Sequence, residues 1–399
     1  MKIKLQDINV DNKKVLLRVD YNVPIKEGKI LDDNKLRASL QTINYLLDHN
    51  CKIIILSHLG KVKKEEDKKN NTLEPVAKKL KELVNTKVIF SKQTRNYTLE
   101  EMVEKLQPKE ILVLENTRFE DVPDNLESGC DLQLASYWAG LADIFVLDAF
   151  ASMHRVHAST AGIAKFIPSC IGFLVQKEME MLDKVIINPE KPFTIIMGGA
   201  KVDDKLKVMN KLLPKADHFL LTGGIANTFL KVLGINIGES LVSDDEEVLS
   251  EVKDMLLKYK DKILLPYDCI VGKNYDDSYI ELKNIHDLDN DDVIKDLGSK
   301  SIEEYKKIID ESKTIFLNGT AGVYEDERFA NGTKEMLNII SSSKAITIVG
   351  GGDAVSAVRN FNYESKFKYI STGGGATLKY IENGTLDALK YIEDEVEKL

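Results

Sequence analysis

Short apolar segments recur along the whole chain, and each runs for about four to eight residues before polar residues or glycines interrupt it. Valine, isoleucine, leucine and phenylalanine dominate these segments, as in strands that are buried on both faces of a parallel sheet. In the first half of the chain we predict strands at residues 14–20, 52–60, 87–90, 111–119 and 143–150. In the second half we predict them in the segments 193–201, 218–226, 262–268, 314–320, 345–353 and 367–375.

Helix-like stretches lie between many of these segments. In residues 72–84, Leu73, Val76, Leu80 and Val84 recur at the helical spacing and share one face. Alternation of strand, helix and strand predicts parallel sheets with right-handed crossovers. The sequence therefore predicts an α/β fold.

The chain has 399 residues, more than one ordinary core accommodates, so two globular domains are expected. Pro168 precedes a plausible helix at 171–187, and two further prolines then follow within residues 188–192. We predict domains at 1–170 and 188–384, joined by this helix.

Composition narrows the function classes. Lys and Arg number 55 against 64 Asp and Glu, and the net charge of −9 argues against general binding to nucleic acid or an anionic membrane. The four cysteines are far apart in sequence, which suggests neither a disulfide framework nor a zinc site. No apolar run approaches the roughly 18 residues of a membrane span, so a soluble cytoplasmic protein is expected. The acidic residues 290–292 are expected on the solvated surface.

Polar residues follow the predicted strands at their carboxyl ends, where parallel sheets bind ligands. The ends in the first half carry Arg18, Asp20, Asn22, His58, Arg118, His154 and Arg155, and Arg37 follows in a nearby loop. A single arginine here would most simply form a surface salt bridge. Several arginines at one edge instead indicate a multivalent site for carboxylate or phosphate.

The strand ends in the second half carry glycines, at 198–199, 223–224, 350–352 and 373–375. Glycine lets backbone N–H groups approach a phosphate, and a following helix adds its positive end. Asp353 could cap a helix or bind Mg²⁺ beside phosphates, and the residues alone favour the cap. Lys201 and Lys205 are four residues apart and would point toward the same site. Neither a P-loop nor a dinucleotide-binding G-x-G-x-x-G motif is present, which argues against a nicotinamide-dependent dehydrogenase.

Eight collinear motifs together closely resemble the phosphoglycerate kinase family. They are RVDYNVP at 18–24, SHLGK at 57–61, LENTRF at 114–119, DAFASMHRVHAS at 148–159, GGAKVDDK at 198–205, NGTAGVYE at 318–325, GGGDAVSAV at 350–358 and STGGGAT at 371–377. The resemblance implies two Rossmann-like parallel-sheet domains, a hinge helix and an active-site cleft between the domains. It also implies a monomer whose C-terminal tail, about 385–399, packs on the first domain.

The implied reaction is the reversible transfer of the acyl phosphate of 1,3-bisphosphoglycerate to Mg-ADP, which gives 3-phosphoglycerate and ATP without a general base. The residues that match the family's phosphoglycerate site are Asp20, Asn22, Arg37, His58, Leu59, Gly60, Lys61, Arg118 and Arg155. Those that match its nucleotide site are Gly199, Ala200, Lys201, Lys205, Gly224, Gly298, Asn318, Gly322, Val323, Glu325, Gly351, Gly352, Asp353 and Ala354, with Asp353 holding Mg²⁺. The transferred phosphoryl group would meet Arg37, Lys201, Gly373 and Gly374.

The chain departs from the family pattern at a few positions. Lys61 stands where arginine is common, and residues 317–325 read LNGTAGVYE without the usual proline. The second change bears on nucleotide preference more than on reaction type. A catalytically weak relative that acts as a metabolite-binding or scaffold protein is the alternative, but Arg37, Arg118, Arg155 and Asp353 are intact and favour an active enzyme.

Overall fold

The structure is a computed structural model that describes residues 2–200 and 202–394, and the chain divides into two compact units. Unit 1 contains the described residues up to Glu180 and those from Thr385 onward, and unit 2 contains Met181–Gly384. The division falls inside helix α5, Phe173–Ile186. No helix within the described ranges is both long enough and apolar enough to cross a membrane.

Unit 1 is built on a six-stranded sheet in which every pair of neighbouring strands is parallel. Its strands are β1 Lys14–Val19, β4 Lys52–Leu56, β5 Val88–Phe90, β6 Ile111–Val113, β7 Ile144–Asp148 and β8 Ser169–Ile171. The spatial order is β5-β6-β4-β1-β7-β8, so β1 lies between β4 and β7. Arg18 is in register with Leu56 and Val19 with Asp148, which brings the ends of these three strands together.

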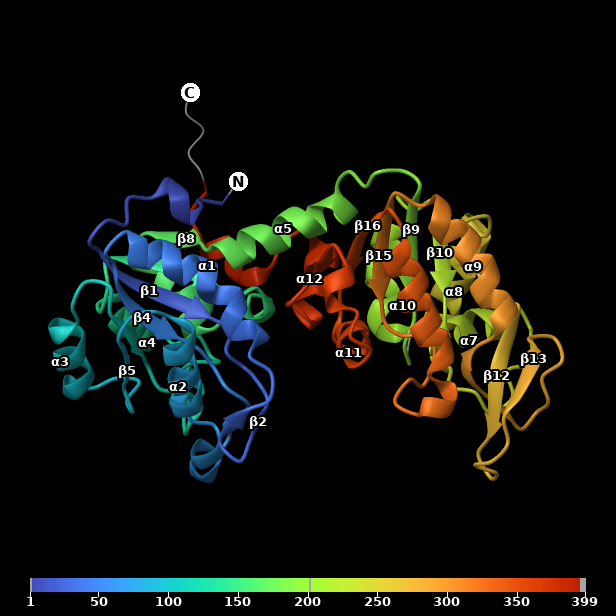
Figure 1. Ribbon diagram of the computed structural model, residues 1–399, viewed down its shortest axis with the longest axis horizontal. Helices are drawn as coiled ribbons and strands as arrows, with labels where there is room; N and C mark the ends of the chain where they lie inside the picture. The colour runs from blue at the N-terminus through green and yellow to red at the C-terminus, as the bar shows by residue number, and fades with distance from the viewer. Residues whose placement is uncertain (1, 201, 395–399) are drawn as a thin grey trace. The chain divides into compact units, whose positions relative to one another are not determined.

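Helices surround this sheet, namely α1 Asn34–Asp48, α2 Glu74–Leu83, α3 Tyr97–Lys105 and α4 Leu132–Ala139. Leu36 and Ile43 of α1 and Val76 of α2 pack against Val15 and Ile53 of the sheet, on the side where Figure 1 shows the two helices. Nearly every residue of β1 and β4 is buried, which explains their unbroken apolar sequence. A short hairpin, β2 Ile25–Lys26 with β3 Lys29–Ile30, follows β1.

Both described ends of the chain lie in unit 1. Residues beyond Gly384 form a short 3-10 helix, η10 Asp387–Tyr391, in which the Ala388 N–H donates to the carbonyl of Met153 at 2.9 Å. Lys2 forms an ion pair with Asp394 at 3.0 Å. The tail up to residue 394 therefore packs on unit 1.

Unit 2 repeats the architecture with a second parallel sheet of six strands, in the order β11-β10-β9-β15-β16-β17. These strands are β9 Phe193–Met197, β10 His218–Leu221, β11 Ile263–Leu264, β15 Thr314–Asn318, β16 Ile346–Val349 and β17 Tyr369–Ile370. The helices of this unit are α6 Leu206–Leu212, α7 Gly223–Val232, α8 Glu246–Tyr259, α9 Ser299–Glu311, α10 Asn331–Ser342, α11 Gly352–Asn360 and α12 Gly375–Asn383. The predicted α/β fold with two parallel sheets is confirmed.

Six of the strands that the structure describes were missed by the sequence pattern. Unit 2 carries a three-stranded antiparallel sheet of β12 Asp268–Lys273, β13 Glu281–Asn284 and β14 Asp292–Leu297, in which β12 is the central strand; Figure 1 shows β12 and β13 side by side. Polar residues interrupt each strand, and β13 is mostly exposed, so no long apolar run marks them. The hairpin strands carry one isoleucine and one lysine each and neither residue of either strand is fully buried, and β8 begins with a serine, so none of them forms an apolar run.

Asp148, at the end of β7, links the sheet of unit 1 to the start of α5. Its carboxylate accepts hydrogen bonds from the Thr42 hydroxyl at 2.6 Å and from the Val175 N–H at 3.1 Å. A Cβ at Gly172 would clash with this carboxylate, so glycine is needed there. Burial outweighs the hydrogen bonds and raises the pKa of Asp148 to about 6.

We predict that Asp148→Asn changes how the stability of unit 1 depends on pH. The folded pKa of about 6 exceeds the ordinary value of 3.8, so the carboxyl's contribution is complete below about pH 4 and is lost as the pH rises through 6. The loss is on the order of 3 kcal/mol for a shift of two units. The amide does not titrate, so the variant should gain stability relative to wild type between about pH 4 and 7.

Denaturant unfolding followed by the fluorescence of Trp138 tests this prediction, because Trp138 is the single tryptophan and is buried in unit 1. A stability difference between variant and wild type that stays constant across this pH range would contradict it.

Candidate active site

Basic side chains gather at the carboxyl edge of the sheet in unit 1. Arg18 belongs to β1, and His58 follows β4. Arg118 lies in the 3-10 helix η3, Thr117–Asp121, and His157 directly precedes the π-helical turn η5, Ala158–Gly162. Their charges act on one another, because both Arg18 and Arg118 lower the pKa of each histidine.

Burial and the neighbouring cations both act on the two histidines. Burial, together with the nearby Arg18, Arg118 and Lys35, lowers the pKa of His58 to about 3 against the opposing charge of Asp20. Burial and the arginines likewise lower the pKa of His157 to about 3. Both imidazoles are therefore neutral at pH 7 inside an electropositive site.

Acidic and hydroxyl groups hold some of these cations in place. Arg118 donates to Asp121 at 2.9 Å and to the Ser128 hydroxyl, which itself donates to Asp121 at 2.5 Å. Lys35 donates to the buried carboxylate of Asp20 at 3.0 Å. Such contacts fix each donor before a ligand arrives.

Of the three arginines predicted for this site, Arg118 is 14% exposed, whereas Arg155 and Arg37 are exposed. The Nε of Arg155 donates to His154 at 3.0 Å, and the Arg155 side chain is exposed. Arg37, on α1, is 55% exposed and makes a bidentate pair with Asp33 at 2.8 and 3.0 Å. This pair occupies the Nε and Nη2 edge of the Arg37 guanidinium.

The loop after β4 is tied to its neighbours through backbone N–H groups. The Gly60 N–H donates to Asn22 at 2.9 Å, and the Leu59 N–H donates to Asn116 at 3.1 Å. Lys61 is exposed on the same loop. The structure thus ties the loop that carries His58, Leu59 and Gly60 to Asn22.

Unit 2 contains a cavity of about 240 Å³ at the carboxyl edge of its own parallel sheet. Of the predicted nucleotide-site residues, those that line it are Gly199, Ala200, Gly224, Gly322, Val323, Glu325 and Asp353. Unpredicted lining residues are Gly223, Asn227, Leu241, Ile294, Lys295, Thr320, Ala321 and Tyr324. Ile294 and Lys295 escaped prediction because they lie on β14, in the antiparallel sheet that the apolar pattern did not reveal.

Glycine allows close approach at the floor of this cavity. A Cβ at Gly224 would clash with the carbonyl oxygen of Ala200, and a Cβ at Gly351 would clash with the Asn318 amide. Gly351, with φ of 91°, directly precedes α11, and Gly374, with φ of 53°, directly precedes α12. Both helices therefore begin at left-handed glycines. In α12 the N–H groups of Ala376 and Thr377 already donate to the carbonyls of Gly373 and Gly374, at 2.9 and 3.2 Å.

Lys205 and Asp353 supply opposite charges beside the cavity. Lys205 donates to the carbonyl of Gly198 at 2.5 Å, and burial lowers its pKa to about 8 although Asp353 and Asp204 oppose the shift. Asp353 lies exposed in the first turn of α11 and lines the cavity. An exposed carboxylate next to glycine N–H groups suits Mg²⁺, which takes one or two carboxylates and obtains its other ligands from phosphates and water.

Several predicted nucleotide-site residues lie outside the cavity lining. Asn318 donates to the carbonyl of Gly350 at 2.7 Å and so ties the end of β15 to the loop before α11. Gly298 directly precedes α9 beside Asp268, which accepts hydrogen bonds from the first turn of that helix. Gly352 begins α11, and Ala354 packs into the core behind it. Gly373 donates to the Ser371 hydroxyl at 3.1 Å, and Lys201 lies outside the described residues.

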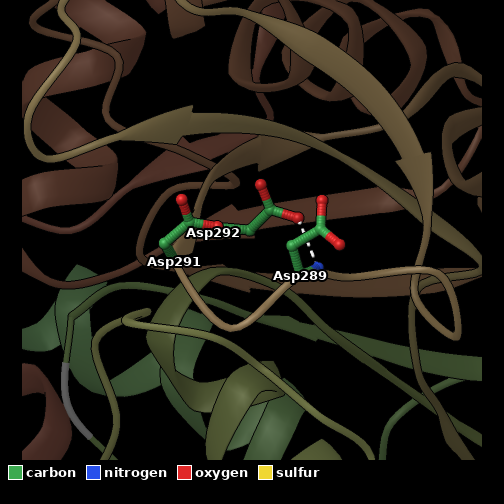
Figure 2. A group of neighbouring side chains, drawn as sticks. All are labelled: Asp289, Asp291 and Asp292. Atoms are coloured by element: carbon green, nitrogen blue, oxygen red, sulfur yellow. Dashed lines mark hydrogen bonds between the residues drawn. The ribbon is translucent and has the colours of Figure 1, made fainter.

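An acidic group elsewhere in unit 2 corrects one expectation from the sequence. Asp289, Asp291 and Asp292 bring carboxylate oxygens within 4.8 Å of one another, and Figure 2 shows Asp292 accepting from the Asp289 N–H. Asp292 is buried rather than solvated, because Lys273 and Lys283 each approach it to 2.9 Å. The two ammonium groups already balance the charge that a metal ion would balance.

The comparisons with known proteins agree with this arrangement. The family model described as phosphoglycerate kinase matches residues 5–384, and so spans both units. The chain belongs to the phosphoglycerate kinase family.

The chain is also similar to individual phosphoglycerate kinases over nearly its whole length. A phosphoglycerate kinase of Fusobacterium nucleatum is 45% identical over 383 residues, which are 95% of this chain and 96% of that protein. One from Finegoldia magna is 46% identical over 380 residues, or 94% of each. The solved phosphoglycerate kinase of Coxiella burnetii superposes with a TM-score of 0.86 at 35% identity and covers 98% of both chains. That of Pyrococcus horikoshii OT3 gives a TM-score of 0.81 at 31% identity, again over 98% of both.

We predict that Gly224→Ala weakens nucleotide binding by this phosphoglycerate kinase family member by at least about tenfold, or about 1.4 kcal/mol. The added methyl group meets the carbonyl of Ala200 on the cavity lining and must displace it. Calorimetric titration with Mg-ADP measures the effect. The control is Gly272→Ala, on β12, where a Cβ makes only ordinary contacts at 3.5 Å or more. Equal affinities of the two variants would contradict the prediction.

Proposed function

We propose that the chain catalyses the reversible transfer of the acyl phosphate of 1,3-bisphosphoglycerate to Mg-ADP, which gives 3-phosphoglycerate and ATP. The electropositive edge of unit 1 carries this proposal. Two histidines are held neutral there by burial and by surrounding arginines, so the site stabilises negative charge rather than further positive charge. Membership of the phosphoglycerate kinase family agrees with it.

The reaction needs no general base. An oxygen of the terminal phosphate of ADP attacks the phosphorus, the bond from phosphorus to the acyl oxygen breaks, and its electron pair stays on the departing carboxylate. The nucleophile is already ionised at neutral pH, and no proton moves. The enzyme therefore has to position the reactants and balance charge.

The residues divide these tasks between the two units. In unit 1, Arg118, Arg155 and His58 bind the phosphoglycerate, and Arg37 moves from Asp33 to the transferred phosphoryl group. In unit 2, the cavity holds the nucleotide, Lys205 balances phosphate charge, and Asp353 holds Mg²⁺. Bound Mg²⁺ would neutralise nucleotide phosphate charge. The N–H groups that follow Gly351 and Gly374 donate to phosphoryl oxygens.

We also propose that the protein acts in the cytoplasm as a monomer. Its four cysteines are free thiols, which suits a reducing compartment. Both points remain predictions.

The decisive assay measures ATP-dependent consumption of 3-phosphoglycerate with Mg²⁺, coupled to reduction of the acyl phosphate formed. We expect turnover that requires both substrates and Mg²⁺. If the protein binds both substrates at millimolar concentrations but does not turn them over, the scaffold alternative holds instead.

Arg37→Ala should lower kcat by roughly 10²-fold or more, as expected when a donor to transition-state charge is lost. Arg95→Ala is a matched control, because Arg95 is also half-exposed and also paired with a carboxylate, that of Glu120 at 3.0 Å. Steady-state kinetics of both variants give the comparison. A near-normal kcat for Arg37→Ala would remove Arg37 from the catalytic set.

A further inference from the structure

Arg18 is a fully buried cation to which the proposed reaction gives no task. It lies on β1, one residue before the end of the strand, and its side chain is 0% exposed. Burying a guanidinium is costly unless its donors are satisfied. The hydrogen-bond partners of the guanidinium therefore indicate the role of Arg18.

Three contacts define the position of the guanidinium. Its Nε donates to the Ser159 hydroxyl at 2.8 Å, and its Nη1 donates to the carbonyl of Val19. Its Nη2 lies 3.3 Å from Nδ1 of His58. Arg18 thus bridges the π-helical turn η5 and the loop after β4.

A buried carboxylate fixes the far end of this chain of hydrogen bonds. Glu127 is 0% exposed and accepts from the Ser159 hydroxyl at 2.5 Å and from the Ser159 N–H at 2.9 Å. The hydroxyl proton of Ser159 points to Glu127, so a lone pair of its oxygen remains for Arg18. The chain runs from Arg18 through Ser159 to Glu127, with every proton directed toward the carboxylate.

The direction of the contact with His58 follows from the chemistry of arginine. A guanidinium has five N–H donors and no acceptor, so Arg18 can only donate to the imidazole. The Nδ1 of His58 must then offer a lone pair, and a neutral imidazole with Nδ1 unprotonated carries its proton on Nε2.

We propose that Arg18 is a positioning residue that holds His58 as the neutral tautomer protonated at Nε2. His58 then offers an N–H donor to an anionic oxygen. The opposite tautomer would point a lone pair at that oxygen and repel it. The consequence for phosphoglycerate binding rests on the proposed function, whereas the tautomer itself does not.

The chain provides an internal reference for the tautomer. His49 places its Nδ1 2.7 Å from the carbonyl oxygen of Tyr45. A carbonyl only accepts, so neutral His49 must carry its proton on Nδ1. We therefore expect the two histidines to be opposite tautomers, which one sample can show.

Long-range ¹H–¹⁵N correlation spectra of the ¹⁵N-labelled, unliganded protein at about pH 8 distinguish the two tautomers. The chain has six histidines, and His58→Gln and His49→Gln assign the two signals. We expect His58 protonated at Nε2 and His49 at Nδ1. A His58 signal of the Nδ1-protonated form, or of a mixture, would overturn the proposal without any variant of Arg18.

Two variants then test the link to Arg18. Arg18→Met keeps the apolar stem and removes every donor, so His58 should become a mixture of tautomers. The KM for 3-phosphoglycerate should rise about tenfold, while kcat and the KM for ATP change much less. Arg18→Lys keeps a donor-only group and should restore the Nε2-protonated form. Arg95→Met, a loss of one arginine elsewhere in unit 1, should leave the spectrum and both KM values unchanged.

These results separate the two proposals. A pure Nε2 tautomer that persists in folded Arg18→Met would refute the role of Arg18. If Arg18→Met does not fold, Arg18→Gln, whose amide can donate or accept at Nδ1, should give the same mixture, and a pure Nε2 tautomer there would refute the role. A wild type that lacks turnover but shows the expected spectra would refute the proposed function and leave the positioning of His58 intact.

Discussion

Parallel strand pairing is the constraint on which both sites depend. Parallel strands need crossover connections, and the helices in these connections cover the sheet faces. Buried faces require apolar residues, so polar groups can reach a ligand only where the strands end. In unit 1, β1 is paired on both sides, with β4 and β7, and its end is therefore flanked by theirs. In unit 2, β9 lies between β10 and β15 in the same way, and the Gly198 N–H donates to the carbonyl of Asn318 at the shared edge.

The two units solve the same electrostatic problem by different means. Unit 1 offers cationic side chains, and burial together with their field keeps two histidines neutral beside them. Unit 2 offers backbone N–H groups at two helix starts, with Lys205, Glu325 and Asp353 as the described charged residues of the predicted set in or beside its cavity. Arginine side chains can orient a small anion through several bidentate hydrogen bonds. Backbone N–H groups at glycines instead suit phosphates that must come close to the main chain. The lack of a general base is consistent with both.

The sequence predicted the long buried strands because both faces of each strand are covered, so their residues form unbroken apolar runs. It also predicted that polar residues follow these strands, and the structure places Asp20, His58, Gly199 and Asp353 within a few residues of the ends of β1, β4, β9 and β16. It could not predict β12 and β14, whose polar residues are satisfied by partners distant in sequence. Asp292 is the clearest example: its position in an acidic run indicates solvent, and only the approach of Lys273 and Lys283 explains its burial. Gly298 stays a prediction: it directly precedes α9 beside Asp268, and it is not among the residues that line the cavity.

The buried network of Arg18, Ser159 and Glu127 also sets the direction of its hydrogen bonds, which no single one of these residues reveals. A buried guanidinium and carboxylate could often be replaced by apolar groups at little cost in stability, so their presence needs another reason. In unit 1 the hydrogen-bonded series from Arg18 through Ser159 to Glu127 has a fixed direction, because the Glu127 carboxylate can only accept hydrogen bonds and Arg18 can only donate them. Ser159, which can do both, has no freedom left once its two neighbours are set. The proton of His58 is thereby placed by groups that never touch the ligand, and a lone asparagine or serine in place of Arg18 would leave that choice open.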